Sequence, residues 1–161
     1  MRDDLRPRMP FPVKLALFGA ASAGVAYAVR QRRRIDFMGK TVLIAGASRG
    51  LGLELARGFA AEGANLALLA RDQKQLDEAA YELRRAGVRV SVHACDITKQ
   101  NEVRDSVRAV IEDCGRIDIL VNNAGIIQVG PAEHMQLDDH ANAMAVHFWG
   151  PLYLSQEVMH I

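Results

Sequence analysis

From residue 41 onward, short apolar runs alternate with stretches of helical periodicity, and this alternation limits the folds open to the chain. We expect strands at residues 41–46, 65–70, 88–95 and 117–125. Helical patterns fill the segments between them, and a longer one begins at about Asp138. Strands that alternate with helices form parallel sheets through right-handed crossovers. The sequence therefore predicts an α/β fold whose doubly wound parallel sheet has about four strands.

Two of these segments carry finer detail. In the first helical pattern, Leu51, Leu55 and Phe59 recur every fourth residue until Gly63, which suits a left-handed helix end. Residues 88–95 instead alternate apolar and polar side chains, which is typical of a strand exposed on one face. We therefore expect that strand near an edge of the sheet.

Glycine and polar residues follow the ends of the predicted strands, where ligands of parallel sheets bind. Gly46, Gly50 and Gly52 lie between the first strand and its helix. Glycine is needed where φ is positive or where a Cβ would block a ligand, and a helix N-terminus attracts phosphate groups. The spacing G-x-x-x-G-x-G differs from the usual dinucleotide fingerprint and from a P-loop, so an ordinary tight turn remains the alternative.

Three motifs together point to a known family. They are the glycine loop at residues 46–52, the Cys-Asp pair that ends at Asp96, and the Asn-Asn-Ala-Gly segment at residues 122–125. In this order and at these separations they resemble the short-chain dehydrogenase/reductase family over about residues 39–161. The resemblance implies a Rossmann-type fold with the strand order 3-2-1-4. It also implies a nicotinamide dinucleotide cofactor, and hydride transfer to or from a small carbonyl or alcohol substrate.

The resemblance also implies roles for individual residues. The glycine loop would hold the cofactor pyrophosphate, Asp96 would bind the adenine amino group, and the loop after the fourth strand would line the cleft. For Asp96 and the asparagines, turn residues without a ligand remain the alternative. The residues expected to bind the cofactor are Gly46, Ala47, Ser48, Arg49, Gly50, Leu51, Gly52, Arg71, Asp96, Ile97, Asn123, Ala124 and Gly125.

The residue after the second strand indicates which dinucleotide binds. An acidic residue there would accept the free ribose 2′-hydroxyl of NAD, but this chain has Arg71. A guanidinium suits the 2′-phosphate of NADP, and Arg49 can add a second one. Asp72 is an argument against NADP, because a carboxylate one residue after Arg71 could shift the preference toward NAD. We expect NADP as the cofactor, with NAD less favoured.

The family's catalytic pair is not found in these 161 residues. A tyrosine followed four residues later by a lysine would act as general acid/base, but Glu157 stands four residues after Tyr153. The expected serine and Tyr-Lys segment would follow a fifth strand beyond Ile161. We interpret the chain as the cofactor-binding part of an oxidoreductase, and a non-catalytic dinucleotide-binding or interaction module as the alternative.

One catalytic candidate lies in the last helical pattern. His147 occupies the position where the family usually has asparagine, and Pro151 deprives the His147 carbonyl of its helical donor. By the resemblance, this carbonyl would hold a water of a proton relay; a helix histidine beside a local kink is the alternative. The other histidines lack metal-ligand spacing, so no metal site is expected.

Residues 1–38 form a separate region in this interpretation, and residues 39–161 form the Rossmann domain. Residues 11–29 carry no charge apart from Lys14 and would span about 28 Å as a helix. The arginine-rich residues 30–34 follow, which predicts a hydrophobic helix that anchors the domain to the cytoplasmic face of a membrane. The alternatives are a hydrophobic helix that packs on this protein itself, which would then be cytoplasmic, and a cleaved signal peptide.

Composition limits the partners. The formal net charge of +1 provides no field that steers the chain toward nucleic acid, so we expect no nucleic-acid partner. Cys95 and Cys114 lack a CxxC spacing and fit free thiols in a reducing compartment. The apolar residues around Trp149 are expected either in the core or in a helix-helix contact of a homo-oligomer.

Overall fold

Strand β1 (Thr41–Ala45) lies inside the sheet, because it pairs with a strand on each side. Its neighbours are β2 (Asn65–Ala70) and β4 (Ile119–Asn122), and β3 (Val90–Ala94) pairs with the far side of β2. The pairings are parallel, and the strand order β3-β2-β1-β4 confirms the predicted sheet. The computed structural model describes residues 35–160, and among them β3 lies at an edge, as predicted.

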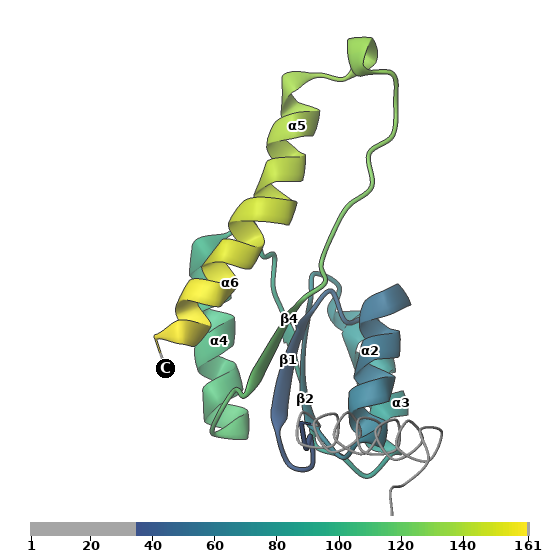
Figure 1. The fold of residues 1–161 in the computed structure, drawn as a ribbon, viewed down its shortest axis with the longest axis vertical. Helices are drawn as coiled ribbons and strands as arrows, with labels where there is room; N and C mark the ends of the chain where they lie inside the picture. The colour runs from purple at the N-terminus through teal and green to yellow at the C-terminus, as the bar shows by residue number, and fades with distance from the viewer. Residues whose placement is uncertain (1–34, 161) are drawn as a thin grey trace, which may run out of the picture. The chain divides into compact units, whose positions relative to one another are not determined.

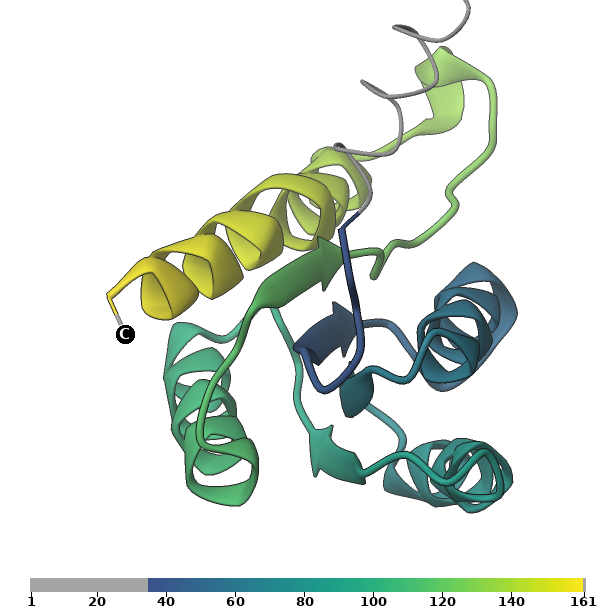
Figure 2. The same cartoon turned by 60° about the horizontal axis from the view of Figure 1, so that its bottom comes forward.

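Helices cover both faces of this sheet (Figure 1). Their bounds are α2 Gly50–Ala61, α3 Gln73–Arg84, α4 Gln100–Cys114, the 3₁₀ turn η1 Ala132–His134, α5 Leu137–Met144, the π-helix η2 Ala145–Trp149 and α6 Gly150–Met159. Figure 2 shows α2 and α3 on one side of the strands and α4 and α6 on the other. This is the doubly wound arrangement expected for crossovers of one hand.

Alternating side chains of β1 enter two separate cores. Val42 and Ile44 are fully buried in a cluster with residues of α2 and α3. Leu43 and Ala45 are fully buried in a second cluster with residues of α4 and α6. Burial on both faces explains why the strand is a continuous apolar run in the sequence.

Helix α2 packs on the sheet through small residues. Its buried residues are Gly52, Ala56 and Ala60, at every fourth position. Leu51, which the leucine pattern placed at the start of the apolar stripe, is 68% exposed. The buried face of α2 therefore has the predicted four-residue spacing but lies one residue later in the sequence. Small side chains on this face let the helix axis approach the strands.

The long helical pattern expected after residue 138 is present, but it contains one widened turn. In η2 the Gly150 N–H donates to the carbonyl of Ala145, five residues earlier. Pro151 follows directly, and in a regular α-helix its ring would clash with the carbonyl of His147. The π-turn is thus the local irregularity that the proline predicted at this position.

The apolar residues around this turn divide between core and surface. Val146 and Leu154 are buried in the α4 side of the core. Met144, Phe148 and Trp149 are 51%, 49% and 45% exposed. The helix-helix contact expected for this stripe stays a prediction.

The predicted membrane anchor at residues 11–29 and the basic residues 30–34 lie outside the described residues. Within residues 35–160, no helix is long and apolar enough to cross a membrane. The unit described here begins at Phe37. The anchor and the division at residue 38 therefore stay predictions.

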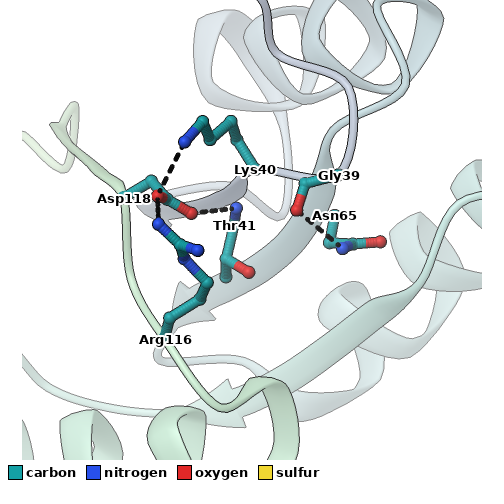
Figure 3. A network of polar contacts seen from close by, with 6 residues as sticks. All are labelled: Gly39, Lys40, Thr41, Asn65, Arg116 and Asp118. Carbon is teal, nitrogen blue, oxygen red and sulfur yellow. Dashed lines mark hydrogen bonds and ion pairs between the residues drawn. The ribbon is translucent and has the colours of Figure 1, made fainter.

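The starts of β1 and β4 are joined by a polar network around Asp118 (Figure 3). The carboxylate accepts a hydrogen bond from the buried Thr41 N–H at 2.9 Å, and the Asp118 N–H donates to the Thr41 carbonyl at 2.9 Å. Lys40, at 3.4 Å, and Arg116 add charge-assisted contacts. The bond from Thr41, followed by those cations, holds the pKa of Asp118 below its usual value.

Replacing Asp118 with alanine would leave the buried Thr41 N–H without this acceptor. We expect Asp118→Ala to lower the free energy of unfolding by about 1–3 kcal/mol in urea denaturation at pH 7. Because folding lowers the pKa of Asp118, the wild-type advantage is complete above the usual carboxyl pKa and is lost as the pH falls below it. The exposed Asp105 on α4 provides the control, and Asp105→Ala should leave stability nearly unchanged. Equal stability of Asp118→Ala and wild type at pH 7 would contradict this role.

Candidate functional site

A cleft of about 1100 Å³ lies at the carboxyl ends of the strands. Its walls come from the loops after β1, β2, β3 and β4 and from η2. The predicted site residues that line it are Gly46, Ser48, Arg49, Gly50, Leu51, Arg71, Asp96, Ile97, Asn123, Ala124, Gly125 and His147. Ala47 and Gly52 belong to the same glycine loop but are buried and do not line the cleft.

The glycine loop is attached to the ends of both strands beside β1. The Gly46 N–H donates to the Leu69 carbonyl of β2 at 2.7 Å. The Gly46 carbonyl accepts from Nδ2 of Asn123, after β4, at 3.0 Å. Gly46 has a φ of +74°, and a Cβ there would lie 2.7 Å from Cα of Ala124. Only glycine satisfies both the backbone angle and this close approach.

The first turn of α2 presents free main-chain donors to the cleft. Arg49 at the N-cap makes no side-chain capping bond, and the first turn contains no acidic residue. The first N–H groups of a helix have no intrahelical partner, and the helix dipole gives them a partial positive charge. This end of α2 therefore suits an anionic ligand.

Three cations stand on the same side of the cleft. Arg49, Arg71 and Lys74 are exposed cleft residues, and none forms an ion pair within residues 35–160. Asp72, which argued against NADP, is engaged elsewhere, because its carboxylate accepts from the Gln75 N–H at 3.1 Å and caps α3. The three cations Arg49, Arg71 and Lys74 therefore outnumber the neighbouring carboxylate of Asp72.

Asp96 is held in a tight turn at the end of β3. Its Oδ1 accepts from the N–H and Oγ1 of Thr98, at 3.1 and 2.8 Å. Its N–H donates to Oε2 of Glu102 at 2.9 Å. The hydrogen bond from Lys99, and then the one from Asp96, lower the pKa of Glu102, which stays ionised as the acceptor. The turn role of Asp96 is thus present, and Oδ2 makes no hydrogen bond within the described chain.

The loop after β4 meets the π-helix at the opposite wall. His147 Nε2 lies 2.9 Å from the carbonyl oxygen of Ile126. Ile97 packs against Gly150, where a Cβ would lie 2.6 Å from the Ile97 side chain. Tyr153 is not in the cleft lining and stacks on Trp149, with ring centroids 6.2 Å apart. The structure therefore brings His147, but not Tyr153, to the predicted site.

Sequence reasoning missed several residues of the cleft. Lys74 and Gln75 come from the first turn of α3, and Asp72 before them carries the signal of a helix N-cap. Ile126 also lines the cleft, but no motif marked it. Cys95 is 2% exposed, and burial raises the pKa of its thiol, so this sulfur is expected to be neutral.

Comparison with known proteins assigns the family. The short chain dehydrogenase family model matches residues 40–161. The chain belongs to the short-chain dehydrogenase family. It is similar to gluconate 5-dehydrogenase of Gluconobacter oxydans, with 38% identity over 120 residues, which cover 74% of this chain and 47% of that protein. It is also 41% identical to 11-beta-hydroxysteroid dehydrogenase 1A of Arabidopsis thaliana over 77% of this chain and 36% of the relative.

Solved structures of the family have the same fold. L-Sorbose reductase from Gluconobacter frateurii, complexed with NADPH and L-sorbose, has a TM-score of 0.74 and 33% identity. An NAD⁺-bound xylitol dehydrogenase has a TM-score of 0.75 and 32% identity. Each comparison covers 78% of this chain and 49% of the other chain. The chain thus spans about half the length of these solved structures.

Two glycines of α2 provide a matched test of the loop geometry. A Cβ on Gly52 would lie 2.1 Å from the Gly46 carbonyl oxygen and 2.6 Å from Nδ2 of Asn123, whereas Gly58 has no such neighbour within 4 Å. We expect Gly52→Ala to reduce the free energy of unfolding by about 1–3 kcal/mol, because the main chain at Gly46 must move to make room for the methyl group. Gly58→Ala should be neutral or stabilising by up to about 1 kcal/mol. Chemical denaturation measures both, and an unaffected Gly52→Ala variant would refute the tight contact.

Proposed function

We propose that this chain forms the NADP(H)-binding part of an oxidoreductase that transfers a hydride between NADP(H) and a small carbonyl or alcohol substrate. Family membership supports an oxidoreductase over the non-catalytic module. The nicotinamide ring supplies the hydride when the dinucleotide is bound. The residues of this chain bind and orient the dinucleotide.

The glycine loop and α2 fit a pyrophosphate. The main-chain donors of the first turn of α2 have no side-chain cap, and a Cβ on the exposed Gly50 would meet no atom within 4 Å, so the space beside it is open. A diphosphate at this place would accept hydrogen bonds from N–H groups and interact with the helix dipole. No acidic side chain of the first turn opposes it.

The observation that carries the choice of NADP is the pair of unpaired guanidinium groups. Arg49 and Arg71 line one cleft, are exposed, and form no ion pair within residues 35–160. A 2′-phosphate would provide the anionic partner that the described chain does not. Asp72 competes little, because its carboxylate caps α3. The relatives include an NADPH complex and an NAD⁺ complex, so the proposal depends on these side chains.

A titration of the full chain with NADPH and NADH tests the proposal. We expect tighter NADPH binding, and Arg71→Asp should weaken NADPH by at least about 10-fold while changing NADH little. Arg108→Asp makes the same charge change at an exposed position of α4, outside the cleft, and should leave both affinities nearly unchanged. Tighter NADH binding, or an equal loss for both dinucleotides in Arg71→Asp, would overturn the choice of NADP.

We also propose that residues 11–29 attach the domain to the cytoplasmic face of a membrane, on the sequence pattern described above. The full chain should float with phosphatidylcholine vesicles in a density gradient. A variant with Leu17→Arg and Val25→Arg should remain unbound, because charges inside an apolar span are costly to bury. Leu137→Arg changes an exposed leucine of the domain and should still float. Flotation of the double variant would refute the anchor.

A further inference from the structure

We propose that His147 is a positioning residue, which fixes the loop after β4 in the shape that dinucleotide binding requires. This inference rests on the proposed function, because it concerns the same cleft. Its basis is the contact between the imidazole and the main chain of Ile126, together with the space that Gly125 leaves for the ring.

The imidazole binds a main-chain group rather than another side chain. Nε2 of His147 lies 2.9 Å from the Ile126 carbonyl oxygen and 3.4 Å from the Ile126 nitrogen. One nitrogen cannot donate to the carbonyl and accept from the N–H in the same neutral tautomer. The shorter distance assigns the proton to Nε2, so His147 donates to Ile126.

Gly125 makes this contact sterically feasible. A Cβ on Gly125 would lie 3.0 Å from Cε1 and 3.6 Å from Nδ1 of His147. The φ of Gly125 is not positive, so the backbone itself accepts alanine. The glycine therefore serves the approach of the ring, and residues 125 and 147 form one structural unit.

The exposed His147 side chain projects from a helix that its neighbours anchor in the core. His147 belongs to η2, which is held to the sheet by Val146, 8% exposed, and its helix continues to the fully buried Leu154. The loop is exposed beyond Ile126, with Ile127 at 91%. The hydrogen bond thus ties the half-buried Ile126 to a helix that Val146 and Leu154 anchor in the core, and both partners line the cleft.

Substitutions at His147 separate this role from general packing. NADPH binding to the full chain is followed by its fluorescence, and thermal denaturation confirms that each variant is folded. We expect His147→Ala to weaken NADPH by about 3- to 10-fold. His147→Gln should restore most of the affinity, because its terminal amide can reach the Ile126 carbonyl. His140→Ala removes an exposed histidine of α5, outside the cleft, and should not change binding.

Gly125→Ala provides a second route that leaves the histidine in place. The added methyl should displace the ring by a few tenths of an ångström and weaken NADPH. In the His147→Ala background, the same change should add little, because the tight neighbour is gone. Additive losses, or failure of His147→Gln to restore binding, would overturn the inference.

The outcomes distinguish this inference from the proposed function. A wild-type chain that binds NADPH, with His147→Ala and Gly125→Ala binding equally well, overturns only the positioning role. A folded wild-type chain that binds neither NADPH nor NADH overturns the proposed function, and the inference with it.

Discussion

The contact of Gly46 with the ends of β2 and β4 determines where the cleft forms. The Gly46 N–H bonds to Leu69, its carbonyl accepts from Asn123, and its Cα face lies against Ala124. These contacts turn the chain sharply out of β1 and direct it into α2. The first turn of α2 consequently faces the space between the strand ends. A side chain larger than hydrogen at residue 46 would separate these elements.

Charge then distinguishes the two sides of the cleft. The wall near β2 has exposed cations, and its carboxylate at Asp72 is engaged by a helix N-terminus. The wall near β4 is built from main chain, Asn123 and His147. A ligand with anionic groups at one end and a ring at the other matches this division better than a uniformly charged one. Family membership and local electrostatics thus both support the proposal that a nicotinamide dinucleotide binds here.

The sequence predicted the sheet and most of the cleft, because both depend on local patterns. Continuous apolar runs indicate buried parallel strands, and the strand ends of such a sheet meet at one edge. The buried face of α2 was predicted one residue out of phase, since close packing on β1 selects glycine and alanine over Leu51. The bond from His147 to Ile126 joins residues 21 apart, through a π-turn whose side-chain directions no short-range pattern specifies.

The Asp118 network stands at the opposite end of the strands from the cleft. The Asp118 network and the cleft are therefore separated by the apolar length of β1. Changes at sites so far apart that share no partners generally combine without mutual influence. The bond between Asp118 and Thr41 should therefore tolerate changes in the loops of the cleft.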